Sequence, residues 1–215
     1  ATTDPNEGVA RVPDDRLSLL GEMSDSKKII PATIQFTDIG GLVEGAAKGE
    51  GLGNRFLAGI REVDAIVFVL RAFSDGDVPG PTDPVEHLRI VEVELALADL
   101  ETTQKQFSKM EKAAKADPSI SQVLNSLKHA SEQLDEGIPI YKSDLTSEER
   151  ELLAEFFLLT NKPVLAVVNL GEEQVEQTNQ ILEPVIAELS NQEVIGMCVQ
   201  LEADAALMTT EEQAE

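Results

Sequence analysis

Apolar positions along the chain form four strand-like segments, separated by segments of helical periodicity. Alternating β-branched residues predict a strand over Ala32–Thr37 that ends at Asp38. Three continuous apolar runs are typical of strands buried on both faces of a parallel sheet: Ala65–Leu70, Pro163–Val168 and Glu193–Val199. Apolar residues at helical spacing predict helices over Arg55–Val63, Ser147–Leu159 and Gln174–Leu189. This alternation predicts an α/β fold with a mostly parallel sheet flanked by helices.

The longest helical pattern lies between the second and third strands. Apolar residues recur at helical spacing from Asp83 to Leu134, with a break at Asp117-Pro118. Two long antiparallel helices joined by a turn are therefore expected. They could simply cover the sheet, but the first would run for about 30 residues, roughly 45 Å, so we favour a protruding coiled-coil arm. The predicted organisation is an α/β domain of residues 1–82 and 145–208, an inserted helical hairpin of residues 83–144 and an acidic tail of residues 209–215.

Composition limits the partners and the compartment. A formal net charge of −23 argues against a nucleic-acid-binding surface, because a phosphate backbone is bound by clustered Lys and Arg. No stretch approaches the roughly 18 to 20 apolar residues that span a bilayer, so no membrane association is expected. The single cysteine, Cys198, fits a reducing compartment, and its apolar neighbours predict a buried structural thiol. We therefore expect a cytoplasmic protein.

The strongest chemical signal follows the first predicted strand. Residues Asp38 to Leu42 read D-I-G-G-L and lead into a glycine-rich stretch that runs to Asn54. A carboxylate at the carboxyl end of a parallel strand lies where α/β sheets bind ligands, and it can hold Mg²⁺ through a water molecule. Gly41, three residues later, lets its backbone N–H approach a phosphate closely. The short pattern D-x-x-G is common by itself, and the longer sequence makes it specific.

Residues 38–66 resemble the Obg-like translation-factor NTPases, in which D-x-x-G-L-x-x-G-A replaces the D-x-x-G-Q of Ras-like enzymes. The resemblance implies a P-loop NTPase-like fold and Mg²⁺-dependent nucleotide hydrolysis coupled to a conformational switch. It implies that Asp38 serves the metal and Gly41 the γ-phosphate. Leu42 stands where the water-orienting Gln would be, so the catalytic residues are left unknown.

The third apolar run ends in Asn169-Leu170-Gly171-Glu172, which looks like the N-x-x-E motif of the YchF subfamily. The resemblance implies that Asn169, Leu170 and Glu172 bind the base. It also implies a preference for ATP, because a displaced carboxylate no longer pairs with the N1–H and N2 donors of guanine. The helical hairpin looks like the coiled-coil insertion of that subfamily, which Obg lacks. A GTP-binding protein of the Obg type is the alternative.

Both ends of the chain bear on the resemblance. The first residues, Thr2 to Asn6, resemble the first switch of the family, in which Thr2 would reach Mg²⁺ and the γ-phosphate. The string G-x-x-x-x-G-K-[ST], which supplies most of the phosphate affinity, does not occur in the 215 residues. Of the S-A-x-x-E loop that encloses the base, only Glu202 remains. We therefore expect a chain truncated at both ends, without its P-loop or its C-terminal TGS domain, that binds nucleotide poorly as given and exposes part of its sheet.

Partners and alternatives follow from the same resemblance. Families of this kind work with ribosomes and translation components, although the negative charge gives that no independent support. A non-catalytic module that presents the hairpin to a partner, or a gene fragment without a function of its own, is the alternative from another class. Phe68 is expected in the core, and His87 and His129 at solvated helix positions without a catalytic role.

Overall fold

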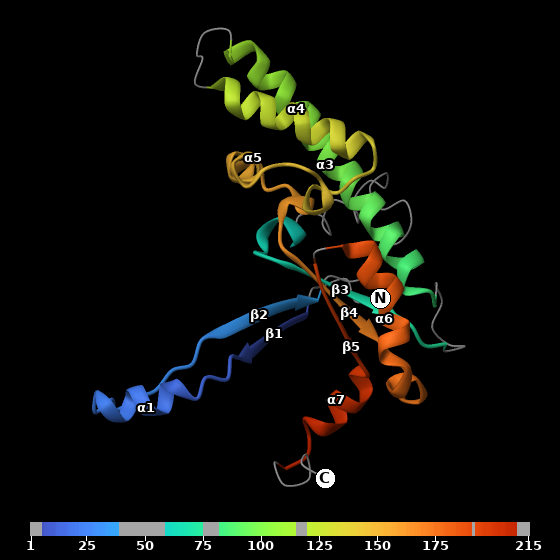
Figure 1. Cartoon of the computed structure of the whole chain (residues 1–215). Helices are drawn as coiled ribbons and strands as arrows, with labels where there is room; N and C mark the ends of the chain where they lie inside the picture. The colour runs from blue at the N-terminus through green and yellow to red at the C-terminus, as the bar shows by residue number, and fades with distance from the viewer. Residues whose placement is uncertain (1–5, 39–58, 75–81, 115–119, 191, 210–215) are drawn as a thin grey trace. The chain divides into compact units, whose positions relative to one another are not determined.

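The computed structural model describes residues 6–38, 59–74, 82–114, 120–190 and 192–209. The chain divides into two compact units, residues 1–42 and 43–215, and each is described by itself (Figure 1). The predictions for Thr2, Gly41 and Leu42 lie outside the described residues, as does the glycine-rich stretch as far as residue 58.

Unit 1 is a two-stranded sheet whose strands are connected through one helix. β1 (Asn6–Arg11) pairs antiparallel with β2 (Thr33–Asp38), and α1 (Arg16–Met23) lies between them in sequence. β2 is the predicted first strand, moved by one residue. Its expected parallel pairing is not what the described residues form, because the chain folds back after α1 and brings β2 antiparallel to β1. Val9, Ile34 and Phe36 of this sheet are at least half exposed.

Unit 2 is built on a parallel sheet of three strands, in the order β3-β4-β5. β3 (Ile66–Arg71) and β5 (Glu193–Met197) flank β4 (Val164–Asn169). The three predicted apolar runs supply these strands. In the register, Asn169 lies opposite Arg71 on one side and Met197 on the other, so all three strands end at the same edge. Phe68 and Cys198 are buried, which confirms both predictions.

The predicted hairpin consists of α3 (Pro84–Ala114) and α4 (Ser121–Asp135), which pack against each other along the second half of α3 (Figure 1). The first half of α3 packs on β3 and on α6 (Thr178–Leu189). One helix therefore serves both of the roles weighed above, as cover for the sheet and as half of an arm. The hydrophobic core between the hairpin and the following loop contains Ala96, Leu127, Ala130, Leu134, Ile140, Leu145, Leu153 and Leu158.

The predicted helix Ser147–Leu159 is broken into three short pieces. α5 (Ser147–Leu152) begins with a reciprocal capping box between Thr146 and Glu149. It is followed by the 3₁₀ turns η4 (Ala154–Phe156) and η5 (Leu159–Asn161). Phe157 ends the helical run because its backbone takes a left-handed conformation, with φ of 51°. The remaining elements are η3 (Ile140–Lys142), η6 (Glu172–Gln177) and α7 (Val199–Ala205).

Polar side chains fix α3 to the rest of unit 2. Asp99, which is fully buried, accepts hydrogen bonds from the backbone N–H groups of Leu159 and Thr160 at 2.8 and 2.7 Å, and from the Thr160 hydroxyl at 2.8 Å. Arg61, in the helical residues 59–62, donates to Thr102 Oγ1 at 3.1 Å. The middle of α3 is therefore anchored both to η5 and to the segment that precedes β3, through residues three positions apart on one face of the helix. Within the described residues, no helix is long and apolar enough to cross a membrane.

Candidate nucleotide-base site

The carboxyl-terminal edge of the parallel sheet carries a hollow of about 440 Å³. Three of the predicted base-binding residues, Asn169, Leu170 and Glu172, lie together in its lining. This is the edge at which open α/β sheets bind ligands. The complete lining comes from the loops after β3, β4 and β5: Phe73, Asn169, Leu170, Gly171, Glu172, Glu173, Cys198, Val199 and Gln200.

Asn169 holds the loops around the hollow together. Its side-chain Oδ1 accepts a hydrogen bond from the backbone N–H of Val199 at 3.1 Å, and its own carbonyl accepts one from the N–H of Ala72 at 2.9 Å. The next residue, Leu170, donates its N–H to the carbonyl of Met197 at 2.9 Å. Leu170 is buried as a whole residue.

Two carboxylates border the hollow at the start of η6. Glu172 and Glu173 are both exposed, and the Glu173 carboxylate folds back over Gly171. A Cβ added to Gly171 would lie 2.6 Å from Glu173 Oε1, so the glycine leaves room for this carboxylate. Carboxylates only accept hydrogen bonds when ionised, so this rim suits a ligand that presents N–H donors.

Gln174 does not line the hollow but bonds to a residue that does, and it escaped the sequence reasoning. Its Oε1 accepts a hydrogen bond from the N–H of Gly171 at 2.8 Å, and its Nε2 donates to the carbonyl of Ala72 at 2.9 Å. A Gln three residues after the residue that precedes a helical turn is the spacing of a capping box, and this signal could have found it. The segment after β5 also differs from the predicted loop, because Val199 begins α7. Glu202, the residue kept from the family loop, lies outside the lining.

The predicted metal ligand Asp38 is the last residue of β2 and is exposed. It lies in unit 1, and the structure does not place that unit relative to the hollow. Among the described residues, no group of three or more His, Cys, Asp or Glu side chains could hold a metal ion. A single free carboxylate is still compatible with Mg²⁺, which usually takes one or two carboxylates and completes its shell with water and phosphate oxygens.

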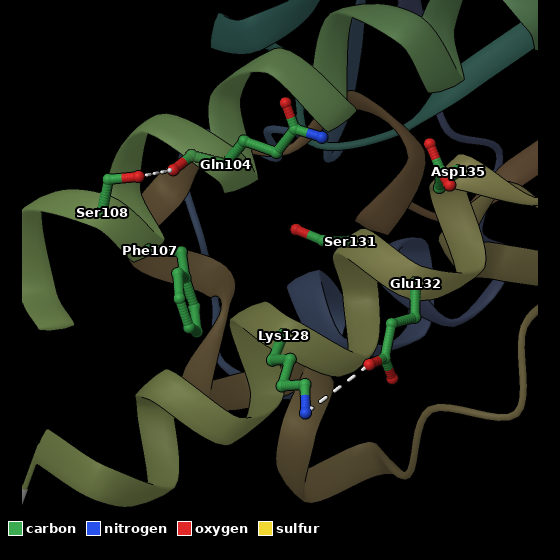
Figure 2. Close-up of a pocket in the computed structure, with 7 residues that line it drawn as sticks. All are labelled: Gln104, Phe107, Ser108, Lys128, Ser131, Glu132 and Asp135. Carbon is green, nitrogen blue, oxygen red and sulfur yellow. Dashed lines mark hydrogen bonds and ion pairs between the residues drawn. The ribbon is translucent and has the colours of Figure 1, made fainter.

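A second hollow, of about 520 Å³, lies on the hairpin between α3 and α4. Figure 2 shows the side chains around it, with Gln104, Phe107 and Ser108 from α3 facing Lys128, Ser131, Glu132 and Asp135 from α4. Lys128 and Glu132 form an ion pair at 3.7 Å. None of the predicted nucleotide or metal residues that the structure describes lines this hollow.

The two histidines differ from the expectation of solvated positions. His87 is half-buried, and its Nδ1 atom is buried without a hydrogen-bond partner among the described residues. Burial, with the charge of Arg71 as a smaller cause, lowers the pKa of His87. His129 is partly exposed, with its Nδ1 atom 2.9 Å from Glu149 Oε1 and its Nε2 atom 2.9 Å from Asp144 Oδ1. Neither histidine borders the hollow at the sheet edge.

Comparison with known proteins gives relatives along nearly the whole chain. A family model described as 50S ribosome-binding GTPase matches residues 1–198. The ribosome-binding ATPase YchF of Bacillus subtilis is 41% identical over 99% of this chain and 60% of its own length. The protein of the same name from Escherichia coli O157:H7 is 37% identical over 100% of this chain and 60% of its own length.

Solved structures lead to the same family. The structure of the Schizosaccharomyces pombe YchF GTPase superposes with a TM-score of 0.78 at 33% identity, covering 99% of this chain and 60% of that one. The chain thus spans about 60% of the length of the relatives it matches. The family resemblance and the predicted α/β P-loop NTPase fold are confirmed. The chain belongs to the 50S ribosome-binding GTPase family, and within it to the P-loop NTPases of the YchF type.

Proposed function

We propose that this chain contains the base-recognition loops and the helical arm of a Mg²⁺-dependent, ATP-hydrolysing switch protein that binds ribosomes in the cytoplasm. The observation that carries the proposal is the meeting of Asn169, Leu170 and Glu172 in one hollow at the carboxyl edge of the sheet. Two relatives that are named ribosome-binding ATPases support the choice of nucleotide and partner.

The preference for ATP rests on Glu172. A guanine base offers N1–H and N2 donors that need an acceptor at a fixed position in the plane of the ring. Glu172 carries its carboxylate one methylene farther from the backbone than an Asp at the same position. The Lys that follows Asn in guanine-binding loops is replaced here by Leu170, whose side chain is buried. The loop therefore lacks two features of guanine recognition.

The phosphates and the metal are assigned to the residues before β3. Asp38 and Thr2 would hold Mg²⁺. When bound, the ion would neutralise part of the negative charge of the phosphates. Gly41 would give its N–H to the γ-phosphate. Leu42 has no hydrogen-bonding group in its side chain, so another group orients the attacking water. Loss of the γ-phosphate would release the segments that contain Thr2 and Gly41, which is the switch.

The direct test is calorimetric titration of the protein made from its complete reading frame with ATP and with GTP, in the presence of Mg²⁺. We expect ATP to bind more tightly, and Glu172→Ala to lower the discrimination between the two nucleotides. The matched control is Glu176→Ala, because Glu176 is exposed in the same η6 turn but does not border the hollow. A clear preference of the unaltered protein for GTP contradicts the ATP assignment and supports the Obg-type alternative.

A second function is favoured by the surface of α3. In its first half, α3 exposes two apolar side chains one turn apart, Val93 at 52% and Leu97 at 42%. Exposed apolar side chains that adjoin on one helix face can form part of a contact with another macromolecule. We propose that this face of α3 contributes to ribosome binding, whether or not nucleotide is hydrolysed.

A further inference from the structure

Gln174 joins the base loop, residues 169–172, to the residue that follows β3. Its amide accepts a hydrogen bond from Gly171 N–H at 2.8 Å and donates one to the carbonyl of Ala72 at 2.9 Å. Ala72 directly follows β3, and Gly171 directly precedes Glu172. One side chain therefore connects the residue after β3 with Gly171, the residue before the one that carries the base-binding carboxylate.

The loop needs this restraint because of its glycine. Gly171 has no Cβ, so its backbone has more conformational freedom than that of any other residue type. Rotation about the Gly171 backbone would move the neighbouring Glu172. Within the described residues, the N–H of Gly171 donates to Gln174. The preceding residues, Asn169 and Leu170, are hydrogen-bonded to residues in or next to β3, β5 and α7. Both bonds of Gln174 are partly buried, which protects them from competing water.

We propose that Gln174 is a positioning residue for nucleotide discrimination: it fixes Gly171 and thereby holds the Glu172 carboxylate where it distinguishes adenine from guanine. The proposal rests on the function proposed above and deepens it. A carboxylate held at one position binds more tightly to a base whose donors match that position. A mobile carboxylate can adapt to either base and so distinguishes them less. Loss of Gln174 therefore weakens ATP binding and reduces its advantage over GTP.

The substitution that tests this is Gln174→Met in the full-length protein, because Met has nearly the same length but neither donates nor accepts as the amide does. The matched control is Gln177→Met, in the same η6 turn, at an exposed position outside the lining of the hollow. We expect ATP to bind about tenfold more weakly to Gln174→Met, as suits the loss of two partly buried hydrogen bonds. The ratio of ATP to GTP affinity falls with it, while Gln177→Met leaves both quantities unchanged.

A second measurement reports on the geometry without nucleotide. Hydrogen exchange at the Gly171 amide becomes faster in Gln174→Met and stays the same in Gln177→Met, if Gln174 is its acceptor in solution. An unchanged exchange rate overturns the proposal. Retained ATP binding with an unchanged ATP-to-GTP ratio in Gln174→Met also overturns it, while the proposed function stands. An unaltered protein that binds neither nucleotide overturns the proposed function and the role of Gln174 together.

Discussion

The side chain of Asn169 and the backbone of Val199 are joined by a hydrogen bond of 3.1 Å across the end of the parallel sheet. Asn169 is the last residue of β4, and Val199 is the first residue of α7. The Asn of the base motif thus has a partner within the protein itself. It holds the loop after β5 against the loop that carries the motif.

Asn169→Ala removes this acceptor and leaves the Val199 N–H without its side-chain partner. We expect ATP affinity to fall about fivefold to tenfold, because the two loops lose one hydrogen bond of about 1 kcal/mol that fixes their spacing. Calorimetric titration measures the change. Asn169→Asp keeps an acceptor oxygen and should recover part of the affinity. Asn179→Ala, at an exposed position of α6, serves as the control, and an equal loss there contradicts the assignment.

His129 gives the fold a dependence on pH. A hydrogen bond with Glu149, helped by Asp144, raises the pKa of His129 above its ordinary value of about 6.5. Because the folded-state pKa is the higher one, the contribution of His129 is complete below about pH 6.5 and is lost as the pH rises through the folded-state pKa. His129→Gln should remove this loss. The contribution of His129 to the free energy of unfolding is at most about 1 kcal/mol, since its side chain is 31% exposed.

Urea denaturation between about pH 5.5 and pH 8.5 measures the effect. His87 provides the contrast, because burial lowers the pKa of His87 and its contribution is lost as the pH falls rather than rises. His87→Gln should therefore leave the alkaline loss in place and reduce the acid loss. A stability profile of His129→Gln that runs parallel to that of the unaltered protein contradicts the role of His129.

The ion pair between Lys142 and Glu92 should contribute strongly to stability. Lys142 Nζ lies 2.6 Å from Glu92 Oε1, and the two side chains are only 15% and 7% exposed. The hydroxyl of Tyr141 also donates to Glu92, at 2.6 Å. Lys142→Met leaves the buried Glu92 with Tyr141 as a donor, so we expect a loss of about 2 to 3 kcal/mol in the free energy of unfolding, near the low end for a broken buried pair.

Urea denaturation compares this variant with Lys128→Met. Lys128 forms an ion pair with Glu132 at 3.7 Å, but these side chains are 64% and 60% exposed. An exposed pair of this kind is worth at most about 0.5 kcal/mol. Equal losses of unfolding free energy in the two variants contradict the view that burial makes the Lys142–Glu92 pair more stabilising than the exposed pair.

Leu97→Glu tests the proposed ribosome contact of α3. The new charge lies on an exposed face of α3, so the fold should be retained while an apolar contact is lost. We expect binding to ribosomes, measured by co-sedimentation of the full-length protein, to fall at least about fivefold. Leu207→Glu places the same change at a side chain that is 89% exposed, after α7. Undiminished sedimentation of Leu97→Glu argues against this face of α3.

Apolar runs predicted all three parallel strands, but the expected burial on both faces holds for β4 alone among them, since Val67 and Val69 of β3 and Ile195 of β5 are exposed in the described structure. β1 was missed, since Glu7 and Gly8 interrupt any alternation in it. The break at Phe157 was missed as well, because a left-handed backbone at a bulky residue is imposed by the surrounding packing and not by the residue itself.

The candidate site divides in the same way. Asn169 and Glu172 were predicted because their motif is short and lies at the end of a recognisable strand. The spacing of Gln174 could have predicted its bond to Gly171 but not its bond to Ala72, which lies about a hundred residues earlier in the chain. Contacts of that range depend on the register between β3 and β4, which only the folded chain sets.

The hydrogen bonds of Asp99 and Thr102 fix α3 at one point inside unit 2, and the hairpin extends beyond that point. From Thr102 to Ala114, α3 extends about 18 Å. A tilt of α3 by about 10° at this fixed point moves Ala114 by about 3 Å over this length. Arg61 bonds to Thr102 at this same fixed point, from the segment that precedes β3. A change in the direction of α3 there that is small enough to keep the hydrogen bond is therefore enlarged at the tip of the arm.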